Sequence, residues 1–323
     1  MKCYQNMVKC MYDKVKLWIG RTAAGSRYEA IASRLDAPKE QTDLSTGEIT
    51  LYGGLDGLRV ALRQDRITVC GSLPKFLYKG SNIPALDRYT TAQAIERLSD
   101  ALHVDMACAT VSEMEFGRTY VMQHPVSAYL VRLGEMERRN REVKNGSLYY
   151  THNGIEQPDE VYFYDKGKEA RKSGMPMPVG FEGANLLRYE IRYKGRLPQQ
   201  MNCPKVEAST LAEKGFYGQM VRIYLERYLS IKKINMDLVD MGRIKNVNDA
   251  INVLLALCLH KMEQDEAALF LEEMKASNVF NDKKYYTRYK KRIKDAMEKA
   301  GKFTADTLIK ELDDEVRNAC AYA

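Results

Sequence analysis

Several sequence patterns that mark common protein classes are missing from this chain of 323 residues. The seven cysteines include no C-x-x-C pair, which argues against a zinc site and for reduced thiols in a cytosol. No G-x-x-x-x-G-K-[ST] segment is present, so a P-loop nucleotide site is excluded. No apolar run approaches the roughly 20 residues of a membrane span, and no signal peptide is evident. The sequence therefore predicts a cytoplasmic protein with no membrane partner.

Histidine is also scarce, and its spacing excludes two further classes of site. The four histidines are His103, His124, His152 and His260. None of them lies in a His-x-His or His-x-x-x-His arrangement, which argues against a metal site of the two-histidine nuclease kind. The absence of His-x-x-Arg argues against a tyrosine recombinase.

The chain does carry a surplus of positive charge. Fifty lysines and arginines against 43 acidic residues give a net charge of +7. Such a surplus is a weak indication of a polyanionic partner. The hydrophobic fraction of 45% is typical of a globular protein.

The hydrophobic pattern predicts an α+β part up to about residue 200 and a helical part after it. In the first part, residues 1–20 suggest an edge strand, 49–69 an antiparallel meander, and 90–102 a helix capped by Thr90 or Thr91. Strands are also expected at 108–116, 147–151, 160–165 and 186–194. The expected domains are residues 1–200, built on a central antiparallel β-sheet, and residues 201–323, which are all helical.

The second part contains the clearest helical periodicity. Apolar residues recur at helical spacing between residues 247 and 262, as they do at 267–274 and 285–293. A last helix is expected to begin at Thr304 and to bury Leu308, Leu312 and Val316.

The stretch from Val161 to Glu169 alternates like a strand. Tyr162, Tyr164 and Lys166 share one of its faces, and Lys168 follows at the same spacing. Two phenols and a cation on one strand face are commonly a packed surface. They are also the parts of a tyrosine nucleophile with an anion-binding partner, since a nearby cation makes the phenol easier to ionise.

Acidic residues follow the same period of two on the neighbouring strands. Glu113 and Glu115 share a face, and Glu190 lies between Arg188 and Arg192 on its own strand. Carboxylates on adjacent strands are suitable ligands for Mg²⁺ or Mn²⁺. The alternative is a solvated sheet face with salt bridges between strands.

A third candidate is a strongly basic helix near the C-terminus. Its cations are Lys283, Lys284, Arg288, Lys290, Lys291, Arg292 and Lys294, interleaved with three tyrosines. The preceding helix and a short turn at 278–282 give the spacing of a helix-turn-helix. Because a solvated helix face normally mixes both signs, this one predicts contact with nucleic-acid phosphates.

Taken in order, three strand segments resemble the filamentous-phage family of rolling-circle replication nickases, which is related in outline to plasmid trans-acting initiators. Glu113-Met114-Glu115 is similar to a metal-binding strand whose usual form is Arg-hydrophobic-Asp. Val161 to Glu169 is similar to the tyrosine strand, hydrophobic-x-x-Tyr-x-Lys-x-x-Glu. Leu187 to Lys194 is similar to the closing Leu-x-Arg-x-Glu strand. The resemblance covers roughly residues 50–200.

This resemblance implies a site-specific DNA endonuclease that nicks one strand at a replication origin. Tyr164 would be the nucleophile, with Tyr162 as the fallback, and would form a 5′-phosphotyrosine link that leaves a free 3′-hydroxyl. Lys166 or Lys168 would lie near the phosphate as a cation. Glu115 and Glu190 would hold Mg²⁺ or Mn²⁺, with Glu113, His124 or Glu169 as a further ligand. Arg188 and Arg192 are expected to contact DNA.

The expected partners are origin DNA, single-stranded or hairpin at the nick, a host helicase and polymerase, and a second copy of the chain. Two alternatives remain: a mobilisation relaxase of a mobile element, which uses the same chemistry, and a DNA-binding regulator without catalytic activity.

Overall fold

The structure is a computed structural model that describes residues 11–25, 28–154, 158–234, 241–262, 264–301 and 306–321. The chain forms two compact units. The first joins Met1–Ile234 with Leu308–Ala323, and the second is Asn235–Thr307. The change in composition near residue 200 is not where these units separate, because the helices at 214–229 and 307–321 share the hydrophobic core of the sheet.

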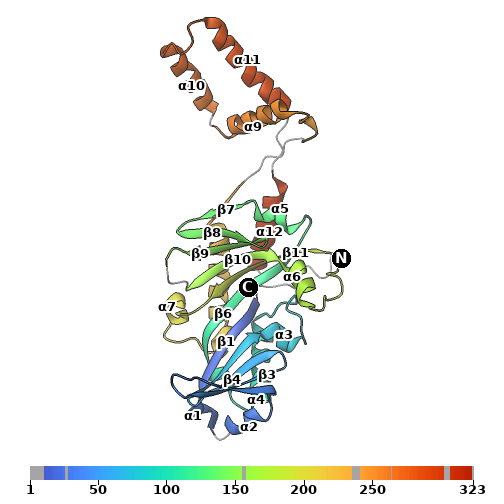
Figure 1. Cartoon of the computed structure of the whole chain (residues 1–323), viewed down its shortest axis with the longest axis vertical. Coiled ribbons are helices and arrows are strands. Elements are labelled where there is room, and N and C mark those ends of the chain that lie inside the picture. Colours follow the sequence, from blue (N-terminus) through green and yellow to red (C-terminus); the bar gives the residue numbers. More distant parts are fainter. Residues whose placement is uncertain are drawn as a thin grey trace. The chain divides into compact units, whose positions relative to one another are not determined.

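Ten strands of the first unit form one sheet in which all neighbours are antiparallel (Figure 1). Its order is β2-β3-β4-β5-β1-β6-β11-β10-β9-β8, and β7 and β12 form a separate pair. The strands are β1 (Met11–Gly20), β2 (Asp36–Thr42), β3 (Ile49–Leu55), β4 (Leu58–Leu62), β5 (Arg66–Ser72), β6 (Thr110–Met122), β7 (Leu133–Met136), β8 (Arg139–Lys144), β9 (Ser147–His152), β10 (Asp159–Asp165), β11 (Asn185–Tyr193) and β12 (Ile231–Lys233).

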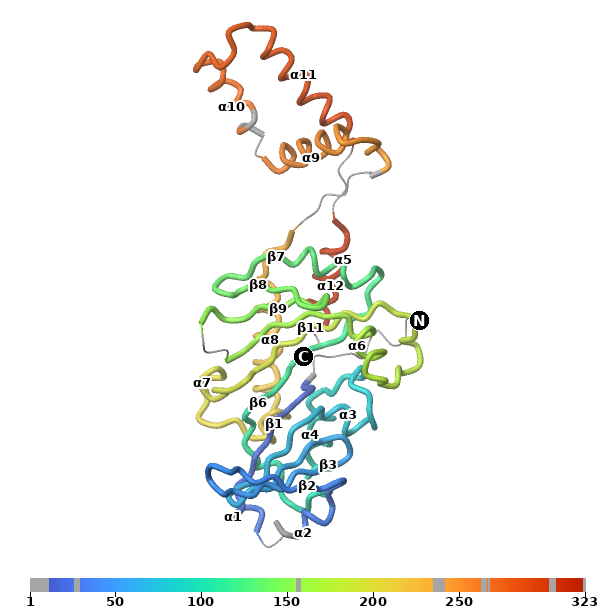
Figure 2. The backbone as a smooth tube through the Cα atoms, viewed as in Figure 1, coloured from blue at the N-terminus to red at the C-terminus, as the bar shows by residue number. Residues whose placement is uncertain are grey.

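Helices connect these strands and make up the second unit (Figure 2). They are α1 (Arg21–Ala24), α2 (Tyr28–Ala32), α3 (Leu73–Leu77), α4 (Arg88–Leu102), α5 (Val126–Leu130), α6 (Lys166–Ser173), α7 (Leu197–Met201), α8 (Lys214–Leu229), α9 (Val247–Lys261), α10 (Gln264–Ala276), α11 (Lys283–Ala300) and α12 (Thr307–Ala321). The predicted α+β class, with an antiparallel sheet followed by a helical region, is confirmed.

The sheet contains the predicted meander and hairpin. Strands β3, β4 and β5 pair in sequence, and β9 pairs with β10. The prediction that the first strand lies at a sheet edge is wrong, because β1 pairs with β5 on one side and β6 on the other. Its central position explains why Tyr12, Val15 and Leu17 are buried.

One face of the sheet forms the hydrophobic core. Tyr217 and Tyr224 of α8 pack edge-on against Phe116 of β6, and Tyr224 also stacks on Tyr189 of β11 at 4.1 Å between ring centroids. The Tyr224 hydroxyl reaches Tyr120 at 3.0 Å. Burying aromatic rings in such contacts stabilises the sheet beyond their area alone. Polar side chains are therefore left on the other face of β6, β10 and β11.

The predicted helices begin and end close to their expected positions, with one different cap. Asp87, rather than Thr90 or Thr91, caps α4 by accepting hydrogen bonds from the backbone of Tyr89 and Thr90. The expected start at Thr304 lies outside the described residues, but α12 buries Leu308, Leu312 and Val316 as predicted. No described helix is both long enough and apolar enough to cross a membrane.

The second unit differs from expectation in what it buries. Helix α9 has the predicted periodicity, but Val247, Ile251 and Leu254 of that stripe are 75%, 52% and 61% exposed. Its fully buried side chains are Val253 and Ala256, which lie at other positions of the helix.

Candidate active site

Three strands of the first unit bring three carboxylates together. Asp13 of β1, Glu115 of β6 and Glu190 of β11 each offer an oxygen, and these oxygens lie within 4.8 Å of one another. Because β6 is paired with both β1 and β11, the three side chains converge over its polar face. The cluster includes the predicted Glu115 and Glu190, and it adds a residue that the sequence did not indicate.

Asp13 was missed because a β-bulge breaks the alternation of β1. Tyr12 pairs with Phe116 and Val15 pairs with Met114, so three steps on β1 match two steps on β6. The extra residue keeps both Tyr12 and Val15 in the core while Asp13 reaches the polar face. Strict alternation groups Asp13 with Val15 and Leu17, so only the three-dimensional register could identify it.

Asp13 is held by Ser72, the last residue of β5, and by Asn82, which follows α3. Its Oδ1 accepts a hydrogen bond from the Ser72 hydroxyl at 2.5 Å, and its Oδ2 accepts one from the Asn82 amide at 2.6 Å. The Asp13 side chain is 4% exposed. These hydrogen bonds fix the side-chain conformation of Asp13, which the strand backbone alone would leave free to rotate.

Gly117 makes room for the cluster on β6. It stands directly opposite Glu190 in the β6–β11 register. A Cβ at this position would lie 2.5 Å from the Tyr189 carbonyl oxygen and 2.8 Å from the Glu190 Cα. Because these neighbours include backbone atoms, they cannot rotate away, and a glycine is required for the close approach.

Arg188 binds two of the three carboxylates, Asp13 and Glu190. Its guanidinium donates to Asp13 Oδ2 at 2.8 Å, to Glu190 Oε2 at 3.0 Å and to the Thr119 hydroxyl at 3.2 Å. The Arg188 side chain is fully buried. Because Arg188 is buried, it cannot make the direct contact with DNA that the sequence suggested. Its hydrogen bonds instead orient the carboxylates of Asp13 and Glu190.

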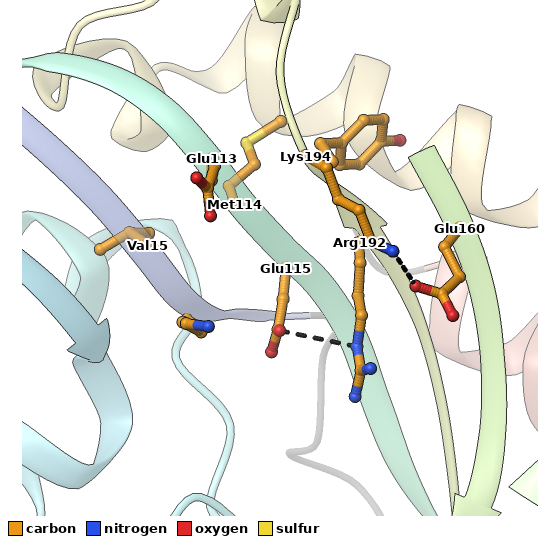
Figure 3. A pocket seen from close by; sticks show the side chains of 9 residues that line it. Val15, Glu113, Met114, Glu115, Glu160, Arg192 and Lys194 are labelled. Carbon is orange, nitrogen blue, oxygen red and sulfur yellow. Dashed lines mark ion pairs between the residues drawn. The ribbon is translucent and has the colours of Figure 1, made fainter. Parts of the chain in front are cut away.

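Arg192 and Glu115 line a pocket beside the cluster and lie next to each other (Figure 3). Arg192 donates to Glu190 Oε1 at 2.8 Å, lies 3.5 Å from Glu115 Oε1 and stacks over the Tyr162 ring at 4.0 Å. The pocket beside them has a volume of about 350 Å³, and Glu113 and Lys194 also line it. Glu113 shares this pocket, but its carboxylate binds Lys16 at 2.6 Å and is not one of the three clustered groups.

Tyr164 lies next to this cluster on β10. Its hydroxyl points to Glu190 Oε2 at 3.5 Å, the outer limit of a hydrogen bond, and its side chain is 8% exposed. Tyr162 stacks on Tyr164 at 4.6 Å, and its own hydroxyl accepts a hydrogen bond from Tyr149 at 3.0 Å. The two phenols thus share a face, as predicted, but Tyr164 is the one directed at the carboxylates.

The predicted lysines do not lie on the tyrosine strand. Strand β10 ends at Asp165, whose carboxylate caps α6, so Lys166 and Lys168 belong to that helix. Lys166 is buried, binds Glu169 at 2.6 Å and has its Nζ 5.9 Å from the centre of the Tyr164 ring. Lys168 is exposed. Of the two predicted lysines, only Lys166 therefore lies beside Tyr164. Its partner Glu169, which was considered as a further metal ligand, is not one of the three clustered carboxylates.

The site perturbs the pKa values of its groups in a consistent way. Burial, followed by the charges of Glu190 and Asp13, raises the pKa of Glu115 to about 8. Burial and then the charge of Glu190 raise the pKa of the Tyr164 phenol. Burial and the neighbouring Arg188 lower the pKa of Lys166. Such shifts arise where like charges are held together out of water, which is common at functional sites.

The remaining candidates lie elsewhere. The His124 ring lies near Tyr129, 6.5 Å between ring centroids, and His124 is not part of the carboxylate cluster found among the described residues. The basic helix α11 belongs to the second unit. All of its predicted cations are exposed, namely Lys283, Lys284, Arg288, Lys290, Lys291, Arg292 and Lys294. The connection from α10 to α11, residues 277–282, is longer than the turn of about 3–4 residues in a helix-turn-helix.

Comparison with known proteins gives one assignment. No curated protein matches the chain. Residues 57–214 match a family model that describes the N-terminal part of a phage replication-associated protein. The match includes Glu115, Tyr164 and Glu190 and ends before the second unit. Residues 57–214 therefore belong to a family of filamentous-phage rolling-circle replication initiators.

Proposed function

We propose that this replication-associated protein is a nickase that cuts one DNA strand at an origin with Tyr164 as its nucleophile. The supporting observation is the position of the Tyr164 hydroxyl, 3.5 Å from Glu190 in a cluster with Asp13 and Glu115. Family membership supports the role in replication, and the geometry supports the choice of residue.

In the proposed reaction, the Tyr164 oxygen attacks a backbone phosphorus atom. A bond forms between the phenol oxygen and phosphorus, and the bond from phosphorus to the 3′-oxygen breaks, which leaves a 5′-phosphotyrosine and a 3′-hydroxyl. The phenol proton passes to Glu190 Oε2, toward which the hydroxyl points, and the departing 3′-oxygen takes up a proton from water. Arg192, which is 28% exposed beside the cluster, is placed to contact a phosphate oxygen.

The cluster suits Mg²⁺ or Mn²⁺ by its donor set, since all three ligands are carboxylate oxygens. Arg188 and Arg192 bind Asp13 and Glu190, but Asp13 Oδ1, which accepts a hydrogen bond from Ser72, has a second lone pair to offer. Among the described residues, the one ion pair of Glu115 is the 3.5 Å contact with Arg192, so its negative charge is the least neutralised of the three. When bound, the ion would polarise the scissile phosphate and stabilise the charge that develops on it.

We assign Asp13 as the third ligand in place of Glu113, which Lys16 already neutralises. Lys166 is the lysine placed to act on Tyr164, whereas Lys168 is exposed at the first turn of α6. Tyr162 remains the fallback nucleophile, although its hydroxyl is directed at Tyr149.

Helix α11 is proposed to bind DNA through its exposed cations, which outnumber its two acidic residues, Asp295 and Glu298. A host helicase, a polymerase and a second copy of the chain remain predicted partners. The same chemistry would serve a mobilisation relaxase, but the family supports replication.

The test is incubation of the full chain with supercoiled origin plasmid and Mg²⁺ or Mn²⁺. The proposal predicts nicked plasmid and a covalent protein–DNA adduct, and Tyr164→Phe should abolish both. Tyr162→Phe, which keeps the ring stack, is the matched control and should retain the adduct.

Two results would contradict the proposal. A wild-type protein that shifts DNA without nicking it would indicate a regulator without catalytic activity. An adduct that survives Tyr164→Phe and is lost in Tyr162→Phe would show that the nucleophile was chosen wrongly.

A further inference from the structure

Beyond the strands of the carboxylate cluster, the sheet continues from β1 onto β5, β4 and β3 (Figure 1). These strands carry a groove of about 440 Å³. Lys14 and Glu113 line both this groove and the pocket beside Glu115, so the groove and the pocket adjoin. A ligand that reaches the carboxylate cluster therefore has a continuous path onto this part of the sheet.

The groove is positively charged. Five cations line it against one carboxylate, and these residues are Lys14, Lys16, Arg59, Arg63, Arg66 and Glu113. Lys16 is neutralised by Glu113 at 2.6 Å, and Arg66 binds Asp65 at 2.9 Å. Lys14 and Arg59 are exposed, and no ion pair joins either of them to another described residue. The groove thus has positive charge to offer to an anionic ligand.

Aromatic rings lie in the same groove. Trp18, the one tryptophan of the chain, is 36% exposed on β1, and Tyr52 lines the groove from β3. The Arg66 guanidinium lies 5.7 Å from the centre of the Trp18 ring. An indole held over an open sheet face, with a cation beside it, offers a flat surface on which a base can stack.

The cross-strand register leaves space between the two rings. Trp18 pairs with Thr68, Thr68 with Ala61, and Ala61 with Tyr52. The backbones of Trp18 and Tyr52 are therefore three strand spacings apart, about 14 Å. Because the side chains of Thr68 and Ala61 are short, they form a floor between the rings rather than fill the gap.

We propose that this groove binds the single-stranded DNA that flanks the scissile phosphate, with bases stacked on Trp18 and Tyr52 and phosphates on Lys14 and Arg59. This inference rests on the proposed nickase function, and it adds a binding surface to it. Single-stranded DNA fits better than duplex, because in a duplex the flat faces of the bases are stacked on each other and closed to side chains.

Trp18 provides a local test, since its fluorescence arises from this groove alone. The full chain carrying Tyr164→Phe is titrated in EDTA with a single-stranded oligonucleotide of origin sequence and with its duplex. The single strand should quench Trp18, and the duplex should not at equal occupancy. Heparin, a polyanion without bases, should bind without quenching.

Two variants test the residues, with binding followed by the anisotropy of labelled single-stranded DNA. Trp18→Ala should weaken binding about tenfold. Arg59→Ala should reduce the slope of log affinity against log salt by about 0.7, as expected for one lost phosphate contact. Arg222→Ala, which removes an exposed arginine from α8, is the matched control and should change neither value.

Equal quenching by duplex, or wild-type affinity and salt slope in Arg59→Ala, would overturn the groove as a single-strand site. These outcomes are separate from the nickase test. A protein that nicks DNA but shows no Trp18 quenching would contradict the groove alone, and quenching without any adduct would contradict Tyr164 catalysis alone.

Discussion

Asp13, Glu115 and Glu190 meet beside Tyr164 because β6, β10, β11 and the bulged strand β1 present them on the same face of the sheet. Glu115, Glu190 and Tyr164 lie on regular strands, so their spacing places them on one face, and the structure brings them together. Asp13 could not be identified in this way, because the bulge in β1 breaks the alternation of that strand. Lys168 was placed beside the tyrosine because the alternation was extended beyond Asp165, where the chain turns into α6.

Glu115 gives the site a pH dependence that can be measured without DNA. Its folded pKa of about 8 exceeds the ordinary value of 4.5, so between these values the folded chain holds a proton that the unfolded chain has lost. In EDTA, the free energy of unfolding should therefore fall as pH rises from about 5 to 8, by at most about 1.4 kcal/mol per pH unit. Urea denaturation across this range measures the slope.

The matched variant is Glu115→Gln, which keeps the shape and cannot titrate. It should lose this decline. A wild-type protein whose stability is flat or rises over this range would show that Glu115 titrates normally.

Arg188 should matter more to stability than any exposed arginine. Replacing it by methionine leaves Asp13 and Glu190 buried without their shared cation, which should cost about 3–5 kcal/mol in urea denaturation at pH 7. Arg222→Met on α8 is the control and should cost less than about 0.5 kcal/mol. A small loss for Arg188→Met would mean that the two carboxylates are not held as charged groups.

At the scale of elements, the site depends on how β6 approaches its neighbours. The sequence predicts the strands and the meander well, because alternating patterns and turn residues are local signals. It did not place β1 at the centre of the sheet, because strand order is set by contacts far apart in the chain. The exposed stripe of α9 has a related cause: periodicity identifies a helix but not which face its neighbours cover.

Gly117 tests the close approach of β6 and β11. Gly117→Ala places a Cβ 2.5 Å from the Tyr189 carbonyl, so the ladder must shift at the carboxylate cluster. We expect a loss of about 1–3 kcal/mol in unfolding free energy and weaker binding of Mn²⁺ by isothermal titration calorimetry. Gly215→Ala, at a helical position with open space, is the control. Unchanged Mn²⁺ affinity in Gly117→Ala would show that the close approach of β6 to β11 does not determine the geometry of the carboxylate cluster.

At the scale of the whole molecule, the chain returns to its first unit through α12. Tyr228 of α8 binds Asp313 at 2.6 Å, and Tyr129 binds Glu311 at 2.5 Å. The second unit is therefore an insertion between β12 and α12. Sequence composition could show that the chain becomes helical after residue 200, but not that its last helix shares a core with the sheet.

This division predicts that binding by α11 and chemistry at Tyr164 can be separated. Replacing Arg288, Lys291 and Arg292 by glutamate should weaken binding of origin duplex at least tenfold and reduce its salt dependence. Adduct formation on a short single-stranded substrate should stay within about twofold of wild type. Loss of both activities together would show that the second unit is needed for chemistry.

The most direct test of the account is to identify the residue that is joined to DNA. A single-stranded origin oligonucleotide is cut by the wild-type protein in Mn²⁺, the adduct is digested with protease and nuclease, and the modified peptide is sequenced by mass spectrometry. Attack by Tyr164 predicts a nucleotide on the phenol oxygen of this residue. A nucleotide on Tyr162, or on any residue away from the Asp13, Glu115 and Glu190 cluster, would contradict it.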